Sequence, residues 1–398
     1  MTMRKTLAAG VALAALVAMA TAAYAAAPPQ GKLLVWEKVR LAETTYESAA
    51  VFDVNNDGKP DIFCGDSWFA GPDFKVKGNA GPIKATGDYF DDFGEVPIDV
   101  NGDGYLDVVT GGWFGKSVRW RENPKGDPAK EWPEHLIAEC GSVEALDACD
   151  LDGDGRLEIV PNTPNQPQKV YKLVVDAAGK GTGKFAEIVI SEKPLGHGLG
   201  CGDINGDGRP DIVYAKGWIE APKEPLGGAK WAAHEEFSLG SASVPVIVAD
   251  VNGDKLADLI VGQSHEYGLD WWEQKRDGDK RTWTKHPIDP FNSQYHALVW
   301  TDVDGDGKPD LVTGKRLHAH RDKDPGDADP AGTYYFKWTG EGFAKQVIDY
   351  GVGAAGKGCG IFFPVTDVNG DGRPDVIAPG KDGLNLYVNK GFAEIKKH

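Results

Sequence analysis

Seven copies of one aspartate-rich pattern constrain the fold of this chain more than any other feature. Each copy places acidic or amide residues at positions 1, 3, 5 and 9, and the copies start at Asp53, Asp99, Asp150, Asp203, Asp250, Asp302 and Asp367. Successive copies begin 46, 51, 53, 47, 52 and 65 residues apart. A period of about 50 residues is typical of one four-stranded blade of a β-propeller.

Short apolar runs flank the copies, for example 246–249 before the fifth and 311–312 after the sixth. Such runs are typical of strands, so each aspartate loop joins the two strands of a hairpin. A weaker pattern at 132–137, 185–190, 283–288 and 343–348 predicts outer strands. We therefore predict an all-β fold, a seven-bladed β-propeller.

The two ends of the chain offer candidates for closing the ring. Residues 36–41 match the outer-strand pattern although they precede the first loop. An N-terminal strand that completes the last blade would remove the open sheet edges. Residues 392–397 resemble an outer strand as well and compete for that place. Because a closed ring is one domain at this length, residues 26–398 are predicted to form a single domain.

The first 25 residues are predicted to be a signal peptide. Arg4 and Lys5 precede an apolar stretch at 6–20, and Ala23 and Ala25 offer the small residues of a cleavage site. We expect export to the periplasm or the extracellular space; the alternative is a short N-terminal anchor. No later apolar run approaches the roughly 18 residues that a membrane span needs.

The net charge limits the classes of partner, and the cysteine content limits the number of disulfides. The net charge is −17, and becomes −19 without Arg4 and Lys5, which argues against nucleic acid or an anionic membrane. The five cysteines are too few for a disulfide framework. Cys149 and Cys201 precede aspartate loops and are interpreted as small core residues, with one bridge left open.

The loops, we predict, bind calcium. Positions 1, 3 and 5 supply side-chain oxygens, position 7 a backbone carbonyl and position 9 a carboxylate, and such hard ligands converging from one turn suit Ca²⁺. The predicted ligands are Asp53, Asn55, Asp57 and Asp61; Asp99, Asn101, Asp103 and Asp107; Asp150, Asp152, Asp154 and Glu158; Asp203, Asn205, Asp207 and Asp211; Asp250, Asn252, Asp254 and Asp258; Asp302, Asp304, Asp306 and Asp310; Asp367, Asn369, Asp371 and Asp375.

One loop departs from the pattern. Six loops have glycine at position 6, where a left-handed conformation is expected, and the fifth has Lys255. The alternative for all loops is a metal-free Asx turn. Three or four carboxylates in each loop would then repel one another without a compensating cation, so calcium is favoured.

At these residues the chain resembles the FG-GAP and VCBS repeat family, which includes the propeller of integrin α chains. The resemblance covers about residues 36–390. It implies a calcium-binding propeller, and it implies no particular activity.

Residues six positions before each loop are expected on the face of the ring opposite the loops, which we call the top face. A strand rises about 3.3 Å per residue, so this face lies roughly 20 Å from the calcium loops. Four of the seven residues at this position are ionisable: Glu47, Glu144, His197 and His296. Residues after the returning strands reach the same face, among them Trp113, Trp218, His265, Lys315, Arg316, His318, His320 and Lys381.

These side chains suggest a site. Glu47, Glu144, His197 and His296 are candidates to bind a transition metal such as zinc, or to act as acid and base. Lys315 and Arg316 are candidates to stabilise an oxyanion, and Trp113 and Trp218 to stack on a sugar. For each residue the alternative is a structural role, which we favour for the outer-strand residues His135, His234 and His286.

Residues 290–335 are similar to the propeller portion of aldos-2-ulose dehydratase, a lyase acting on keto-sugars. The resemblance implies proton abstraction beside a carbonyl followed by elimination, with His296, His320 or Lys315 as the base. The leading hypothesis is thus a carbohydrate-directed site, that of a lyase or isomerase. The alternative is a non-enzymatic module that binds a glycan or a protein. Close convergence of Glu144, His197 and His296 would favour a metal or catalytic centre.

Overall fold

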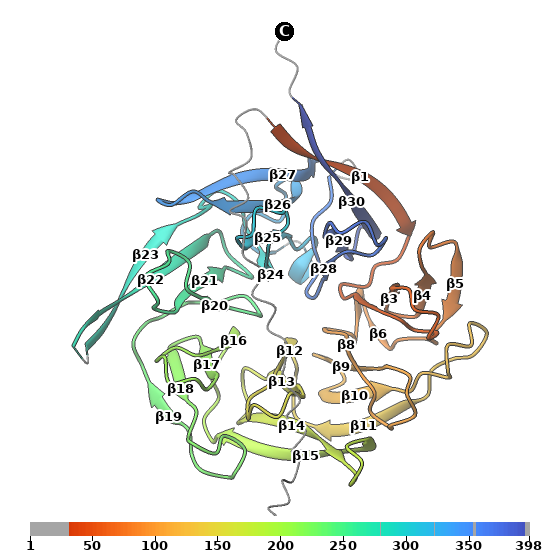
Figure 1. The fold of residues 1–398 in the computed structure, drawn as a ribbon, viewed down its shortest axis with the longest axis horizontal. Coiled ribbons are helices and arrows are strands. Elements are labelled where there is room, and N and C mark those ends of the chain that lie inside the picture. The colour runs from red at the N-terminus through yellow and green to blue at the C-terminus, as the bar shows by residue number, and fades with distance from the viewer. Residues whose placement is uncertain (1–31, 279, 322, 353–355, 395–398) are drawn as a thin grey trace, which may run out of the picture.

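The computed structural model describes residues 32–278, 280–321, 323–352 and 356–394, and these form a ring of seven four-stranded antiparallel sheets (Figure 1). The predicted seven-bladed propeller is confirmed. The predicted signal peptide, residues 1–25, lies outside the described residues.

Blades 1 to 6 each place their four strands in sequence order from the ring axis outward (Figure 1). Blade 1 has β2 (Ala50–Phe52), β3 (Asp61–Cys64), β4 (Ser67–Ala70) and β5 (Val76–Asn79). Blade 2 has β8 (Val96–Ile98), β9 (Asp107–Gly112), β10 (Ser117–Arg121) and β11 (Glu134–Glu139). Blade 3 has β12 (Ala145–Cys149), β13 (Glu158–Asn162), β14 (Gln168–Val175) and β15 (Gly181–Ser191).

Blade 4 has β16 (Leu199–Gly202), β17 (Asp211–Tyr214), β18 (Gly217–Glu220) and β19 (Ala232–His234). Blade 5 has β20 (Ile247–Ala249), β21 (Asp258–Gly262), β22 (Leu269–Asp277) and β23 (Lys280–Pro287). Blade 6 has β24 (Tyr295–Thr301), β25 (Asp310–Lys315), β26 (Ala331–Trp338) and β27 (Phe343–Gly351).

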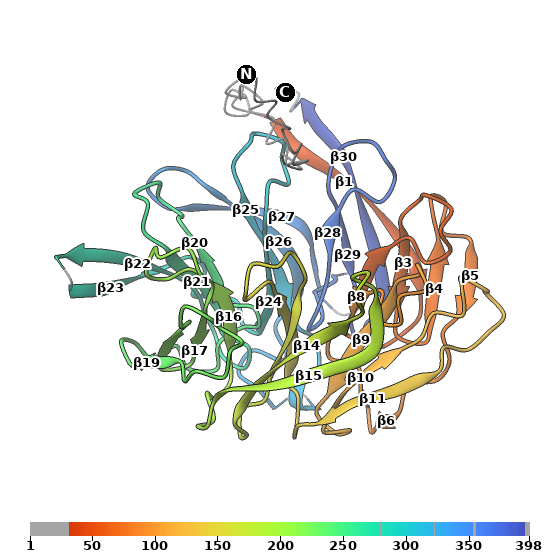
Figure 2. The ribbon, with the colours of Figure 1, turned by 60° about the horizontal axis from the view of Figure 1, so that its bottom comes forward.

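Blade 7 combines both ends of the described chain. Its strands are β28 (Val365–Thr366), β29 (Asp375–Ala378), β30 (Leu384–Glu394) and, outermost, β1 (Lys32–Ala42). β1 runs antiparallel to β30 from Lys32 opposite Glu394 to Ala42 opposite Leu384 (Figure 2). The predicted closure by residues 36–41 is therefore correct. Residues 392–394 extend the third strand of the blade and do not form an outer strand.

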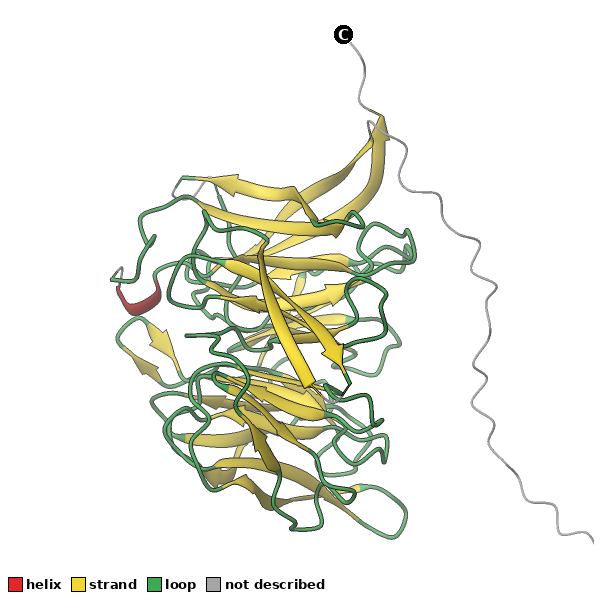
Figure 3. Cartoon of the chain, turned by 90° about the vertical axis from the view of Figure 1, so that its left-hand side faces the viewer, coloured by secondary structure: helices red, strands yellow, loops and turns green. Residues whose placement is uncertain are grey.

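Little of the described chain lies outside the blades. A hairpin of β6 (Ala85–Thr86) and β7 (Tyr89–Phe90) precedes blade 2, and a single 3₁₀ turn, η1 (Ala319–Arg321), follows β25 (Figure 3). Buried apolar side chains from neighbouring blades form the core between the sheets, as Leu146, Val109 and Tyr171 do for blades 2 and 3. No helix in the described ranges is long and apolar enough to cross a membrane.

The aspartate loops join the first and second strands of every blade. The position-9 carboxylate is buried and accepts the backbone N–H of position 2, as Asp61 does from Val54 at 2.9 Å. Lys255 adopts φ 69°, close to the 82–93° of the glycines at that position in the other loops. The fifth loop therefore keeps the backbone of the others.

Cys149 and Cys201 form a disulfide with 6.5 Å between their Cα atoms. The bond joins β12 to β16, which are the inner strands of blades 3 and 4. The sequence favours small core residues at both positions and leaves one bridge open, and the structure has that bridge. Cys64, Cys140 and Cys359 are buried free thiols.

Candidate metal centre on the top face

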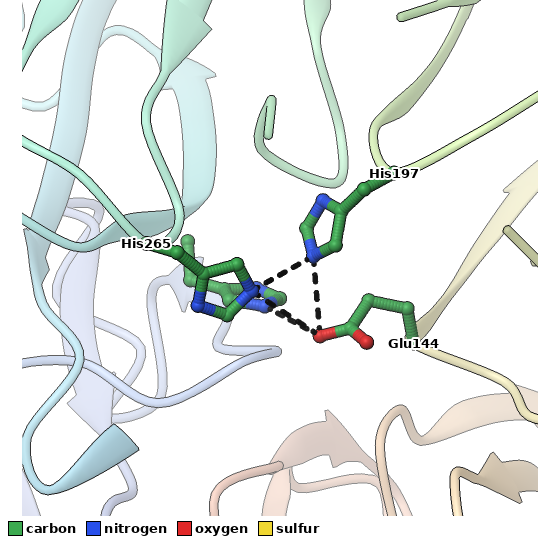
Figure 4. Close-up of side chains that lie close together, drawn as sticks. Glu144, His197 and His265 are labelled. Atoms are coloured by element: carbon green, nitrogen blue, oxygen red, sulfur yellow. Dashed lines mark hydrogen bonds and ion pairs between the residues drawn. The ribbon is translucent and has the colours of Figure 1, made fainter. Parts of the chain in front are cut away.

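Four side chains from four different blades converge at the top of the ring axis (Figure 4). Glu144 directly precedes β12, His197 precedes β16, and His296 lies at the start of β24. His265 comes from the loop after β21, where the returning strand of blade 5 reaches the same face. Inner strands lie nearest the axis of a propeller, so residues before them can meet across the ring.

The distances within this cluster are short. Glu144 Oε1 lies 3.1 Å from His296 Nε2, 3.3 Å from His197 Nε2 and 3.9 Å from His265 Nε2. The Nε2 atoms of His197 and His265 are 3.0 Å apart. Ligands of a tetrahedral zinc ion lie roughly 3.3 Å from one another, because each is about 2.0–2.2 Å from the metal. The four ligand atoms therefore fit a single first-row metal ion.

Other contacts fix the orientation of two of the imidazoles. His197 Nδ1 lies 3.0 Å from the carbonyl oxygen of Ala242, and His265 Nδ1 lies 2.9 Å from Asp324 Oδ2. An Nδ1–H that donates to a carbonyl or carboxylate leaves the Nε2 lone pair free for a metal, and such outer partners are a regular feature of metal sites. The Nδ1 of His296 is buried without a hydrogen-bond partner among the described residues.

The electrostatics of the cluster favour neutral imidazoles at His265 and His296 beside a charged carboxylate. Burial, followed by the neighbouring histidines, lowers the pKa of His265 to about 3. Burial also lowers the pKa of His296 to about 4. For Glu144 burial alone would raise the pKa, but its contacts with His197 and His296 outweigh burial and hold the pKa well below its usual value. Neutral histidine and ionised glutamate are the forms that bind metal.

A cavity of about 510 Å³ opens directly above the cluster. Its wall contains Glu144, His197 and His265 from the cluster, Arg316 and His320 from blade 6, and the four aromatic residues Tyr89, Phe93, Trp113 and Phe114. His320 Nδ1 lies 2.9 Å from Asp324 Oδ1, so one carboxylate contacts both His265 and His320. The site thus combines a candidate metal centre, a fourth histidine outside that centre and an aromatic wall.

Arg316 is held in place by a buried ion pair. Its Nε and Nη2 atoms lie 2.8 Å and 3.2 Å from the two carboxylate oxygens of Glu47. The guanidinium also lies 5.8 Å from the ring centre of Phe93 and 5.9 Å from that of Tyr89. Glu47, predicted as a candidate metal ligand, instead positions Arg316 at the cavity wall.

Lys315 and Trp218 lie away from the cavity. The buried Lys315 ammonium donates to the backbone carbonyls of Gly326, Asp327 and Asp329, and so holds the loop at 326–329. This placement does not fit the predicted role of Lys315 as base or oxyanion donor. Trp218 is buried and stacks on His234 with 4.2 Å between ring centres, so its predicted contact with a sugar is wrong.

The three outer-strand histidines have the structural contacts that we expected. His135, His234 and His286 stack on Trp120, Trp218 and Trp271. Each also contacts a glutamate of the adjacent strand, and these glutamates are Glu122, Glu220 and Glu273.

Asp324 was not among the predicted site residues, and His265 was noted on this face without a role. The signal for His265 was its position just after a returning strand. Asp324 lies in an irregular loop, where the repeat gives no positional information. Tyr89 lies in β7, outside the repeat, and Phe114 follows the predicted Trp113 in the turn after β9.

The aspartate loops present oxygen donors, which fit calcium. In the fourth loop, Asp203 Oδ1 accepts the N–H groups of Gly206 and Asp207 at 2.7 and 3.1 Å, and Oδ2 accepts that of Gly208 at 2.7 Å. These backbone contacts orient the first carboxylate of the loop before any ion binds.

A family model and one solved structure support the propeller fold. The family model for the FG-GAP-like repeat matches residues 99–160 and 229–313. A crystal structure of BBS1N in complex with ARL6DN, soaked with lead, is 10% identical, covers 91% of this chain and 98% of its own, and has a TM-score of 0.51. The Vibrio cholerae biofilm matrix protein Bap1 is 17% identical with a TM-score of 0.33, covering 80% of this chain and 44% of its own. No curated protein matches the sequence.

Proposed function

Because this chain belongs to the FG-GAP-repeat β-propellers, we propose that it is an exported propeller that binds one divalent first-row metal ion on its top face and acts there on a small carbonyl-bearing carbohydrate. The observation that carries the proposal is the convergence of Glu144, His197, His265 and His296 on one point. Imidazole-rich sites with one carboxylate suit zinc, iron, nickel or manganese. Calcium in the hairpin loops would stabilise the ring.

The reaction class that fits this site is proton abstraction beside a carbonyl, as in a lyase or an isomerase. A metal bound by the cluster would supply Lewis acidity toward the carbonyl oxygen. His320 is the candidate base, because Nδ1–H donation to Asp324 fixes the tautomer that leaves its Nε2 lone pair available. Arg316 at the cavity wall can bind the oxygen on which negative charge develops.

Substrate class follows from the cavity wall. The rings of Trp113, Phe114, Tyr89 and Phe93 give one apolar side, and the cluster with Arg316 gives a polar side. A sugar has an apolar face formed by its C–H groups and an edge of hydroxyl and carbonyl oxygens. A cavity of about 510 Å³ is large enough for a monosaccharide or disaccharide.

The test combines metal analysis with proton exchange. We expect about one transition-metal ion per chain, which Glu144→Gln and His265→Ala should remove. The purified protein is then incubated in D₂O with a panel of keto-sugars, and NMR follows deuterium uptake at the carbon beside the carbonyl. Exchange that depends on the metal and is lost in His320→Asn supports the proposal. Metal binding without exchange for any sugar contradicts the enzymatic part.

A non-enzymatic glycan- or protein-binding module is the second candidate. The aromatic share of the cavity wall favours it, because stacking rings give affinity without requiring chemistry. Under this alternative, calorimetry detects binding of a glycan or a protein, and Trp113→Ala weakens that binding. NMR then shows no deuterium uptake beside the carbonyl of any sugar. The same NMR and calorimetry samples therefore distinguish the two candidates.

A further inference from the structure

A lysine ammonium lies inside the aspartate loop of blade 3. Lys172 Nζ is 2.7 Å from Asp152 Oδ2, 2.7 Å from Asp154 Oδ2 and 3.1 Å from Glu158 Oε1. These residues are positions 3, 5 and 9 of the loop, which are three of the positions that would supply calcium ligands. The ammonium therefore contacts the oxygens that a calcium ion would need.

The same arrangement occurs in blade 6. Lys337 Nζ is 2.7 Å from Asp306 Oδ2 and also forms an ion pair with Asp304. Carboxylate oxygens of Asp302, Asp304 and Asp306 lie within 4.8 Å of one another, a spacing open to a metal ion as well. The lysine contacts two of these three carboxylates and so competes directly for that space.

Lys172 and Lys337 occupy equivalent positions on the third strands of their blades. The residue after position 9 pairs with Tyr171 in blade 3 and with Phe336 in blade 6, and each lysine is the next residue. The same register identifies the equivalent residues of the other blades, which are Ala70, Glu122, Glu220, Glu273 and Val388.

The lysines coincide with a second difference between the loops. Position 3 is aspartate only in blades 3 and 6, as Asp152 and Asp304, and is asparagine in the other five blades. A loop with aspartate there has four carboxylates, and one lysine brings its charge to −3. A loop with asparagine has three carboxylates of its own and no lysine, and in blades 2, 4 and 5 the glutamate at the lysine position accepts a hydrogen bond from that asparagine. The extra carboxylate and the lysine thus occur together in both blades.

We propose that Lys172 and Lys337 take the place of calcium in blades 3 and 6, so that these two loops are closed by an internal cation and calcium binds only in the other five. The tethered ammonium is always present at the loop and needs no ion from solution. To bind there, a calcium ion would have to displace the ammonium group. The positive charge of the lysine would then remain beside that of the ion. This inference rests on the proposal that the asparagine-type loops bind calcium.

The test counts calcium ions. After dialysis against low micromolar calcium, metal analysis is expected to give five calcium ions per wild-type chain. Lys172→Met keeps the apolar stem and removes the charge, and should raise the count to six; adding Lys337→Met should raise it to seven. Lys169→Met is the matched control, because Lys169 lies on the same strand but pairs with Glu187 at 2.6 Å, and the count should stay at five.

The reverse change keeps the test decisive if a methionine variant fails to fold. Asn369→Asp combined with Val388→Lys introduces the blade 3 arrangement into blade 7 and should lower the count to four. A wild-type count of seven, or an unchanged count in the Lys172→Met and Asn369→Asp/Val388→Lys variants, overturns the lysine assignment alone. A count of zero in wild type and in all variants overturns both this inference and the calcium proposal.

Discussion

The imidazole rings of His265 and His320 stack on each other, with 4.4 Å between their centres and 20° between their planes. One of these rings belongs to the candidate metal cluster and the other is the candidate base. Both contact the carboxylate of Asp324 through Nδ1, at 2.9 Å each. The cluster and the base are therefore oriented by one shared side chain.

Asp324→Asn should weaken metal binding by about 10–100-fold, the usual cost of removing an outer partner of a metal-binding histidine. The loss should appear in a titration with Zn²⁺ monitored by calorimetry. Asp382→Asn is a control, because Asp382 contacts Lys357 in another loop. Equal affinities in wild type and Asp324→Asn would show that His265 does not depend on this carboxylate.

His197→Ala and His234→Ala should have opposite effects. His197 contacts Glu144 in the cluster, and its removal should abolish transition-metal binding with a small change in melting temperature. His234 stacks on the buried Trp218 and contacts Glu220, and its removal should lower the melting temperature while the metal remains. Metal analysis and differential scanning calorimetry on both variants check this. Metal retained by His197→Ala would place the ion elsewhere.

Chelation should destabilise the propeller, because the five asparagine-type loops then keep three uncompensated carboxylates each. At a calcium concentration 100 times Kd, each site contributes about 2.7 kcal/mol. The melting temperature should fall on addition of a calcium chelator and recover on addition of excess calcium. If metal analysis shows the calcium removed and the melting temperature is unchanged, the loops do not stabilise the fold through calcium.

Stability should also fall as pH rises, because of a buried acid. Glu95 is 1% exposed and accepts the N–H of Gly65 at 2.7 Å. Burial, followed by the charge of Asp92, raises the pKa of Glu95 well above its usual value, and burial raises that of Asp92 as well. The charges facing this pair are those of Arg119 and Arg121.

A raised folded-state pKa contributes stability that is complete below the unfolded pKa of about 4.5 and is lost as pH rises through the folded value. Between pH about 4.5 and the pKa of Glu95 in the folded protein, the melting temperature of wild type should therefore decline more steeply than that of Glu95→Gln. The glutamine of this variant cannot ionise. Parallel curves for the two proteins would mean that Glu95 does not titrate in the folded state.

Removing the disulfide should lower stability without affecting either kind of metal site. The bond between Cys149 and Cys201 closes a separation of 52 residues, and loss of such a bond typically costs about 2–5 kcal/mol. Denaturant unfolding should show the loss in Cys149→Ala/Cys201→Ala, with calcium and transition-metal counts unchanged. Reductant should destabilise wild type and leave the variant unaffected; equal sensitivity would place the effect outside this bond.

The repeat predicted the blades, the loops and much of the cluster, because all three depend on position within a blade. Counting six residues back from each loop found Glu144, His197 and His296, which the ring brings together at its axis. The position after the returning strand, which identified Lys315 and Arg316, could not distinguish between them. Neighbouring residues at the end of a strand point to opposite sides, so Arg316 reaches the cavity wall and Lys315 the loop at 326–329. Asp324 depends on the path of an irregular loop, which has no period.

The pairing of β1 with β30 has a consequence for how the protein is made. A ribosome releases β1 first and β30 last, so the outermost strand of blade 7 waits without a partner until nearly the whole chain has been synthesised. Among the described strands this pairing joins the residues farthest apart in sequence, and the other six blades do not depend on it. A chain cut short before Leu384 would leave β1 without its partner strand and free to join another sheet.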